Sequence, residues 1–337
     1  MTELFKQLCQ IQAVSSNEGA LRTFIIDQIH THCEYSIDKL GNIICFKQGT
    51  KRPKNKVMLD AHMDEVGLIV SAITADGFVK FHTVGGISPS VMLCRKVTFE
   101  NGVVGTVGCK PVHLSTADER KKTPDFDKLY IDIGATDKAS AEKLVGVGDN
   151  AVLDSDFYIM GNNVKARAID DRAGVACLIA LLKKPTEYDY YAVFSVQEEV
   201  GCRGAKAAAY SVNPDVAIVL EATTAADIHD VPEEKRVCTL GQGPAVSFMD
   251  RSTLYERKLY DFAINGNIQC QSKSYVSGGN NSGAIHLSRD GVRTVALSLP
   301  CRYIHSPSCV ANLNDLNRLL DLAEYMLFGA ASGAIDR

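Results

Sequence analysis

The spacing of apolar positions predicts strands and helices in alternation at both ends of the chain. After Ser15-x-x-Glu18, which has the form of a helix capping box, apolar residues recur at helical spacing as far as residue 29. Residues 35–48 are typical of a β-hairpin with a turn at Leu40-Gly41-Asn42, and residues 57–61 are typical of a buried strand. Beyond residue 160 the alternation returns. It predicts strands at 190–196, 216–220 and 292–299, and helices at 173–183, 204–210 and 313–328.

The middle of the chain has a different pattern. Short β-rich pieces alternate with glycines, and no long amphipathic helix is evident. These pieces predict strands at 68–73, 77–81, 97–99, 103–107 and 129–133. We therefore expect an α/β fold in which residues 1–66 and 161–337 form a mixed-sheet catalytic domain. Residues 67–160 would form an inserted small domain resembling a β-barrel.

Composition narrows the class of protein further. Hydrophobic residues make up 46% and charged residues 23%, which is typical of a globular chain. A net charge of −4 gives no basic surface for nucleic acid. No apolar run is long enough to cross a membrane, and the first residues lack the features of a signal peptide. The eleven cysteines are odd in number and include no C-x-x-C pair. Free thiols in a reducing cytoplasm are therefore expected.

Side chains that bind metals follow four of the predicted strands, and two more precede a predicted helix. In open α/β sheets, ligands gather outside the carboxyl ends of the strands. These segments are therefore expected at one edge of one sheet, although they lie far apart in sequence. They are His62 to Glu65, Glu198 with Glu199, Glu221, His305, and Asp170 with Asp171.

These residue types suit a centre with two metal ions. Histidines combined with carboxylates favour zinc, cobalt or manganese over calcium or magnesium. With two divalent ions and three carboxylate ligands the net charge is +1, and a bridging hydroxide makes the cluster neutral. A further carboxylate can then act as general base. The trial ligand set is His62, Asp170, Glu199, Glu221 and His305.

Each of these residues also has a plainer interpretation. An isolated histidine after a strand is commonly a hydrogen-bonded structural residue, and an aspartate pair before a helix has the form of an N-cap. A glutamate pair alone is typical of a solvated turn. Because these residues occur together at the ends of several strands, the metal-ligand interpretation is favoured for them. His82 and His286 have no other candidate ligands near them in the pattern and are expected to be structural. Gly146 to Ala151 fit a loose dinucleotide-binding pattern, but no predicted βαβ unit surrounds them.

Four strings of the sequence resemble the motifs of the tetrahedral (glutamyl and deblocking) aminopeptidases, whose members are often labelled endoglucanase as well. They occur in the family's order along nearly the whole chain. The strings are His62-Met63-Asp64-Glu65-Val66-Gly67, Ala166-Arg167-Ala168-Ile169-Asp170-Asp171-Arg172, Gln197-Glu198-Glu199-Val200-Gly201 and Arg302-Tyr303-Ile304-His305-Ser306-Pro307.

The resemblance implies a role for each of these residues. Asp170 would bridge two metal ions, and Glu198 would be the general base. Asp64 would support the first histidine, as a carboxylate that fixes the tautomer of a ligating imidazole. The resemblance also implies short peptide substrates and a β insert that helps to build dimers, which assemble into hollow dodecamers. His62 and Glu221 would complete one metal site, and Glu199 and His305 the other.

The sequence departs from the family's pattern in two places. Relatives commonly carry Gly-Gly-Thr-Asp-Ala where this chain has Gly278-Gly279-Asn280-Asn281-Ser282, so one acidic group is absent. Relatives also often carry Pro-Gly after the position of Asp227, where this chain has Ile228-His229-Asp230. Neither departure touches an expected ligand. Both lie where they can alter the substrate pocket, so no side-chain preference is transferred to this chain.

The favoured hypothesis is a cytoplasmic metallo-aminopeptidase that removes N-terminal residues from peptides. One alternative is a glycoside hydrolase, which needs two carboxylates flanking a sugar ring and leaves the histidines without a role. The other is an inactive peptide-binding assembly protein with a relict site. Such a site is expected to have lost at least one ligand, whereas here the set is complete.

Overall fold

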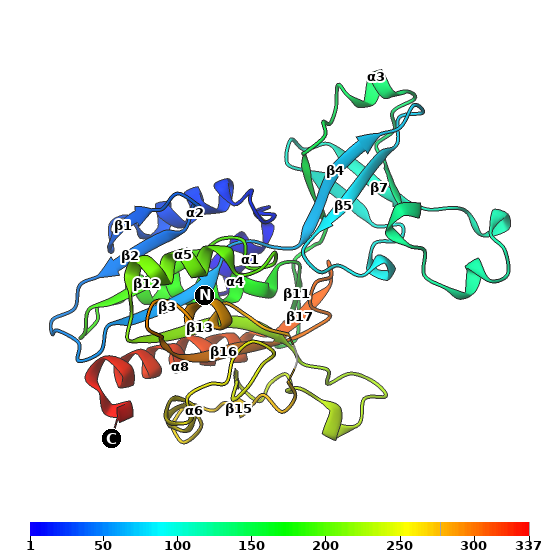
Figure 1. Ribbon diagram of the computed structural model, residues 1–337. Coiled ribbons are helices and arrows are strands. Elements are labelled where there is room, and N and C mark those ends of the chain that lie inside the picture. Colours follow the sequence, from blue (N-terminus) through cyan, green and yellow to red (C-terminus); the bar gives the residue numbers. More distant parts are fainter. Residues whose placement is uncertain (277, 337) are drawn as a thin grey trace.

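A large mixed sheet and a separate closed barrel make up the chain in the computed structural model, which describes residues 1–276 and 278–336 (Figure 1). Within those residues the sheet has eleven strands, and its main order is β1-β2-β12-β3-β13-β16-β17-β11-β10. The neighbours β12, β3, β13 and β16 are parallel, and the other pairs along this order are antiparallel. The strands are β1 (Glu34–Ile37), β2 (Ile43–Lys47), β3 (Val57–His62), β10 (Tyr158–Met160), β11 (Asn163–Ala166), β12 (Tyr190–Ser195), β13 (Val216–Thr224), β16 (Arg293–Arg302) and β17 (Cys309–Asn312), with β14 (Ala245–Val246) and β15 (Gln271–Ser272) pairing beside β16.

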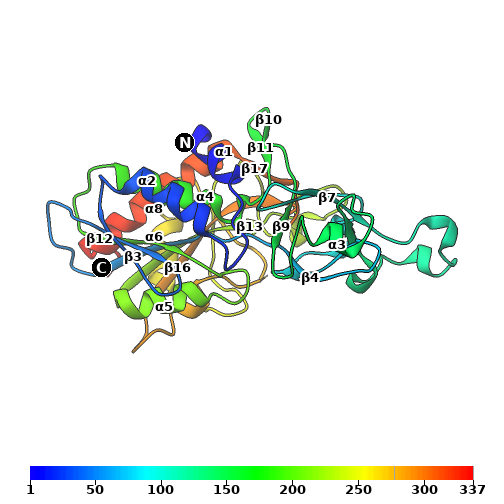
Figure 2. The same cartoon turned by 90° about the horizontal axis from the view of Figure 1, so that it is seen from above.

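Helices cover both faces of this sheet, as Figure 2 shows from above. Leu59 of β3 packs in one core with α1 (Thr2–Gln10), α2 (Gly19–Ile29), α4 (Ile169–Lys183) and α8 (Leu313–Ser332). The next residue back, Met58, packs on the other face against α5 (Arg203–Val212) and α7 (Ser282–Ile285). This alternation follows from the two-residue repeat of a strand, and β3 is buried on both sides. The helix α6 (Arg257–Ile264) packs near α8 and β16.

The middle of the chain closes into a small barrel with a core of its own. The predicted α/β fold class, with a mixed sheet and an inserted barrel-like unit, is therefore confirmed. The division at residues 66 and 160 stays a prediction, and β10 pairs with β11 in the large sheet. The barrel strands, in order around it, are β4 (Gly67–Ile73), β5 (Val79–Val84), β8 (Tyr130–Asp132), β7 (Val104–Gly108), β6 (Lys96–Phe99) and β9 (Asn150–Leu153). The short helix α3 (Lys138–Ala141) begins in a capping box made by Asp137 and Ser140.

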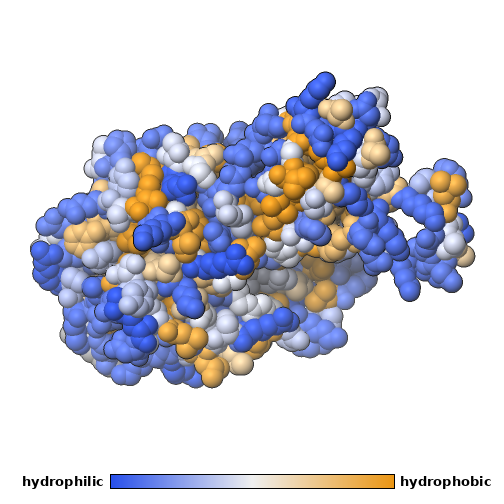
Figure 3. All heavy atoms as spheres, turned by 45° about the horizontal axis from the view of Figure 1, so that its top comes forward, coloured by the Kyte–Doolittle hydropathy of each residue, from blue (hydrophilic) through white to orange (hydrophobic). Residues whose placement is uncertain are grey.

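A long connection between β7 and β8, residues 109–129, stands away from the barrel. Figure 3 shows it as a mostly hydrophilic projection that carries some hydrophobic side chains. Val112, Leu114 and Phe126 are exposed on it. Single turns of 3₁₀ helix occur at Val112–Leu114, Glu119–Lys121 and Phe126–Lys128 in this connection, and elsewhere at Pro89–Val91, Glu233–Lys235 and Ala334–Asp336. No helix of the described chain has the length and apolar character that a membrane crossing requires.

The predicted strands and helices are present, but one cap differs and several ends are shifted by three or four residues, among them the end of β5 and the start of α4. The capping box is wrong, because Glu18 is the N-cap of α2 and the Ser15 hydroxyl donates instead to Asp64. The predicted strand ending at residue 220 continues to Thr224, because its next residues pair with β16. Likewise β16 continues beyond residue 299 to Arg302. The hairpin at residues 35–48 is confirmed as β1 and β2.

A buried ion network ties the N-terminal segment to the end of β3. The side chain of Arg172, in α4, is fully buried and donates to the carbonyl oxygens of Leu8, Ile11 and Met63. Its Nη2 also donates to Glu65 Oε1 at 3.1 Å. Arg167 donates to both oxygens of the same carboxylate. Glu65 therefore compensates two buried cations at the point where the chain leaves the sheet.

Replacing Glu65 by Gln should destabilise the fold by about 3–5 kcal/mol, because it leaves two buried guanidinium groups without their carboxylate. Urea unfolding followed by far-ultraviolet circular dichroism measures the change. The matched control is Glu187→Gln, which removes the ion pair of Glu187 with the exposed Lys51. The control should leave the unfolding midpoint nearly unchanged. Equal urea unfolding midpoints for the two variants would show that the Glu65 ion network does not stabilise the fold.

Candidate metal centre

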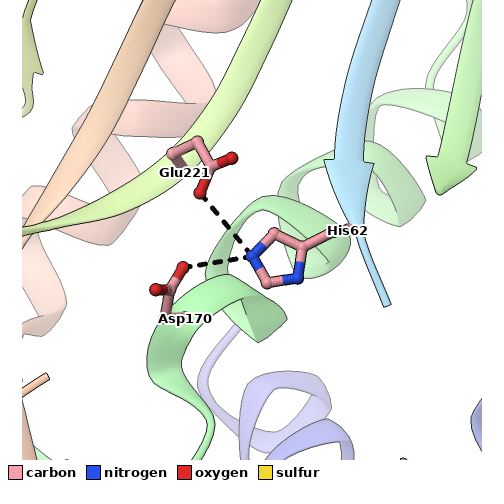
Figure 4. Close-up of side chains that lie close together, drawn as sticks. All are labelled: His62, Asp170 and Glu221. Carbon is pink, nitrogen blue, oxygen red and sulfur yellow. Dashed lines mark hydrogen bonds and ion pairs between the residues drawn. The ribbon is translucent and has the colours of Figure 1, made fainter. Parts of the chain in front are cut away.

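The five predicted ligands meet at the carboxyl edge of the central parallel strands. His62 is the last residue of β3, and Glu221 lies within β13, the neighbour of β3. Asp170 lies at the start of α4, where its backbone angles are not helical. Glu199 follows β12 in the turn before α5, and His305 lies in the loop between β16 and β17. Figure 4 shows the first three side chains pointing toward one another from two strands and one helix start.

Asp170 lies between the two histidines and faces each with a different oxygen. His62 Nε2 is 3.3 Å from Asp170 Oδ1 and 3.6 Å from Glu221 Oε2. His305 Nε2 is 3.6 Å from Asp170 Oδ2 and 3.4 Å from Glu199 Oε2. In each of the two groups the potential ligand atoms lie within 4.8 Å of one another. The structure thus brings together two three-residue groups that share one carboxylate.

These spacings fit the donor set of a small divalent ion. A tetrahedral ion about 2.0–2.2 Å from each nitrogen or oxygen donor holds those donors about 3.3–3.6 Å apart. The four measured separations fall between 3.3 and 3.6 Å. Two imidazoles and three carboxylates are also the ligands that zinc, cobalt and manganese accept. Geometry and chemistry therefore agree that each group can hold a metal ion.

Both histidines have the tautomer that metal binding needs. His62 Nδ1 lies 3.0 Å from the backbone oxygen of Asp64, and His305 Nδ1 lies 2.9 Å from that of Gly86. A carbonyl oxygen only accepts hydrogen bonds, so each Nδ1 carries the proton. In a neutral imidazole this leaves the lone pair on Nε2, the atom that faces Asp170.

Asp64 supports the site in a way the sequence did not suggest. Its carboxylate lies 3.5 Å from His62 Nδ1, farther than its own backbone oxygen. The same carboxylate accepts hydrogen bonds from the amides of Glu198 and Glu199, at 2.9 and 3.1 Å, and from the Ser15 hydroxyl at 2.6 Å. Asp64 therefore fixes the turn that presents the two glutamates, besides lying beside the histidine.

The site holds an excess of buried negative charge. Burial, together with the neighbouring Glu221 carboxylate, raises the pKa of Glu198 to about 8. Burial likewise raises the pKa of Glu199 to about 8, with Asp170 adding to the rise and His305 opposing it. Burial lowers the pKa of His62, but the surrounding carboxylates outweigh it and hold that pKa well above its ordinary value. Burial is thus the main cause for the two glutamates, and the surrounding carboxylates are the cause for His62.

Two oxygens at the site have no hydrogen-bond partner within the described part of the chain. They are Glu221 Oε1 and Asp171 Oδ2, and both are buried. A buried carboxylate oxygen without a partner carries a free-energy cost, which a bound cation removes. The unpartnered Glu221 oxygen is therefore a second, independent sign that the group with His62 and Asp170 suits a cation.

Glu198 differs from the predicted ligands, since it is in neither group. Its carboxylate borders two cavities that open from the site, and its Oε1 accepts a weak hydrogen bond from the Cys202 thiol at 3.5 Å. A carboxylate with a raised pKa at a cavity wall is suited to accept and release a proton. Glu198 therefore lies at the cavity wall, outside both potential metal-binding groups.

Strained backbone surrounds the site. Several non-glycine residues of its loops have positive φ angles, a conformation that is uncommon for residues with a Cβ atom and that clusters at functional sites. They are Ala168 (φ 52°), Gln197 (φ 57°), Cys202 (φ 53°), Tyr303 (φ 58°) and His305 (φ 59°).

The barrel contributes to the site, which the sequence did not reveal. Gly86, just after β5, supplies the carbonyl oxygen for His305. Its neighbour Gly85 has a φ of +78°, and a Cβ there would lie 2.7 Å from the Val66 side chain and 3.3 Å from Glu199 Cβ. Only glycine fits this close approach. The Gly85-Gly86 pair is the sequence feature that could have indicated this contact. Its role depends on how the barrel packs against the large sheet, which the sequence alone does not show.

Comparison with known proteins agrees with this geometry. The family model of the M42 glutamyl aminopeptidases matches residues 41–322. The lysyl aminopeptidase of Pyrococcus furiosus is 32% identical over 340 residues, covering 96% of each chain. The solved structure of a TET aminopeptidase from a marine-sediment archaeon of the Thaumarchaeota is similar with a TM-score of 0.94 and 32% identity, over 99% of this chain and 98% of that one.

A third similar protein is one that forms a large assembly. The TET1 peptidase of Pyrococcus horikoshii, which can assemble into a tetrahedron or a large octahedral shell, is 33% identical with a TM-score of 0.85, over 96% of this chain and 98% of that one. The family resemblance inferred from the four sequence motifs is thereby confirmed. The chain belongs to the M42 glutamyl aminopeptidase family of peptide-bond hydrolases.

Proposed function

We propose that this chain is an aminopeptidase with two divalent metal ions, zinc being the first candidate and cobalt or manganese the alternatives. The observation that carries the proposal is Asp170, whose two oxygens face the Nε2 atoms of two histidines at 3.3 and 3.6 Å. His62, Asp170 and Glu221 would hold one ion, and Asp170, Glu199 and His305 the other. When bound, the ions would polarise the scissile carbonyl group and lower the pKa of a water molecule.

The remaining groups of the chain have roles that follow from their positions. Glu198 accepts the proton of the attacking water on its carboxylate and delivers it to the leaving amine, since it borders the cavities without joining a ligand group. Asp64 keeps the Glu198–Glu199 turn in place through two backbone amides. Gly86 and Asp64 hold the imidazoles with Nε2 toward the site through their backbone oxygens.

The alternative functions fit the geometry less well. A glycosidase needs two carboxylates that flank a sugar ring. Here three of the carboxylates face histidine Nε2 atoms instead, so the histidines have a direct part in the site. An inactive peptide-binding protein needs none of these contacts, whereas every predicted ligand of this chain lies in a group.

Removal of metal should abolish hydrolysis of aminoacyl amides, and zinc, cobalt or manganese should restore it. Asp170→Asn should bind both ions more than about 100-fold more weakly, because even outer-shell partners of ligands are worth about 10–100-fold. Metal content by plasma mass spectrometry measures this loss. Asp76→Asn, in an exposed turn, is the control and should keep both ions. Full activity of a metal-free sample would refute the proposal.

The two adjacent glutamates should respond differently to the same substitution. Glu198→Gln keeps shape and polarity but cannot accept a proton, so kcat should fall about 10²–10⁴-fold while both metals stay bound. Glu199→Gln should weaken one metal and recover activity in part at high metal concentration. Metal content and steady-state kinetics across a metal titration separate the two. Loss of a metal from Glu198→Gln alone would reverse the assignment, and unchanged turnover in both would discard it.

We also propose that the barrel builds an oligomer, either a dimer or a dodecamer. The exposed apolar residues of the connection at 109–129 support this, as does the assembly of the Pyrococcus horikoshii relative. The double variant Val112→Ser, Leu114→Ser should lower the mass in light scattering, because it removes apolar contact surface. The matched control is Leu144→Ser, Val147→Ser, also exposed on the barrel. A monomeric active wild type would contradict the proposal.

A further inference from the structure

Two cavities of different size open from the same pair of glutamates. The smaller, of about 180 Å³, is bordered by Glu198, Glu199, Glu221 and Thr223. The larger is an open cleft of about 1270 Å³ that begins at Glu198 and His305 and runs along α5 and α7. On the proposed function, cleavage separates one N-terminal residue from the rest of the peptide. The small cavity has the size for a single side chain, and the cleft has room for a longer chain.

The wall of the cleft carries exposed cations. Arg203 and Lys206 lie three residues apart on α5, so they share a face of the helix, and both line the cleft. Arg289 lies on the segment after α7, and its guanidinium group is 4.0 Å from the centre of the Tyr210 ring. Arg289 Nε also donates to the Tyr210 carbonyl oxygen at 2.7 Å. This contact holds the Arg289 side chain against the far end of α5.

Little negative charge opposes these cations inside the cleft. Among the described residues that line it, Glu198 and Glu199 are the acidic ones, and both lie at the inner end. Arg203, Lys206 and Arg289 form no ion pair with another described residue within 4 Å. The chain as a whole has a net charge of −4. The cleft therefore presents local positive charge on a protein of the opposite sign, an arrangement that attracts anions.

The cations lie within the distance that a short peptide can span from the site of cleavage. From Arg203 to Tyr210 the helix rises about 10 Å. An extended peptide covers that length in about three residues. A peptide cleaved after its first residue would thus bring the groups two to four residues downstream alongside Arg203, Lys206 and Arg289.

We infer that this cleft binds a carboxylate of the substrate downstream of the scissile bond, so that short peptides with a negative charge there are preferred. The inference rests on the proposed function, because it places the N-terminal residue in the small cavity. Two sources can supply the carboxylate. One is the free C-terminus of a tri- to pentapeptide, and the other is an aspartate or glutamate side chain at the same distance.

The experiment compares matched peptides with one common N-terminal residue. The first pair is a tetrapeptide with a free C-terminus and its C-terminal amide. The second pair, both amidated, carries Glu or Gln at the third position. The acid of each pair should have the higher kcat/KM, mainly through KM, by roughly two- to fivefold for each cation that it reaches. The preference should fade in about 1 M salt. If the acid is preferred in the first pair alone, the cleft recognises the free C-terminus. If the acid is preferred in both pairs, the cleft recognises a carboxylate from either source.

Substitutions then locate the effect. Arg203→Gln, Lys206→Gln and Arg289→Gln should each reduce the ratio of acid to amide, and the triple variant should bring it to about one. Lys143→Gln removes the same charge from an exposed barrel residue outside the cleft and should keep the ratio. A ratio of one in both peptide pairs with the wild type, or a preference that the triple variant leaves unchanged, overturns the inference.

A binding measurement separates this inference from the proposed function. Calorimetric titration of the Glu198→Gln variant with the same peptides reports affinity without turnover. Tighter binding of the acids, lost in the triple cleft variant, supports the inference even if no peptide is hydrolysed. Equal binding of acids and amides overturns it, even if aminoacyl amides are cleaved as proposed.

Discussion

Crowding of buried carboxylates around one shared aspartate is the constraint on which the rest of this structure depends. Asp170 faces two imidazoles, and burial together with neighbouring carboxylates raises the pKa values of Glu198, Glu199 and Glu221. Such a cluster is unfavourable without added positive charge. The loops that carry these groups include residues with positive φ angles, such as Gln197 and His305.

The register of the sheet positions the candidate ligands relative to one another. His62 of β3 pairs in register with Ser195, the last residue of the parallel strand β12, so the turn carrying the glutamates begins beside the histidine. On the other side β13 runs parallel to β3 and carries Glu221 past the end of their pairing. The barrel then closes over this edge and holds His305 through the Gly86 carbonyl oxygen. The inserted unit is thus part of the active-site geometry as well as a candidate for assembly contacts.

The fold class could be predicted from the sequence because the spacing of apolar residues differs between strands and helices. The ligand candidates could be predicted because parallel strands end at one edge, and His62 and Glu199 follow that rule. The rule fits Glu221 poorly, since this residue lies inside β13 and its strand runs on to Thr224. The capping box failed because Ser15 bonds to Asp64, a partner 49 residues away that no local pattern indicates. The Gly86 contact and the cationic cleft depend on how separate segments pack, which a single sequence does not contain.

The central claim is that Asp170 bridges two metal ions. Anomalous X-ray diffraction at the zinc absorption edge, on crystals of the zinc-loaded wild type and of Asp170→Asn, tests it most directly. The account predicts two anomalous peaks in the wild type, one beside His62 and Glu221 and one beside His305 and Glu199, and the loss of both in the variant. A single peak, or two peaks that persist without the Asp170 carboxylate, would contradict it.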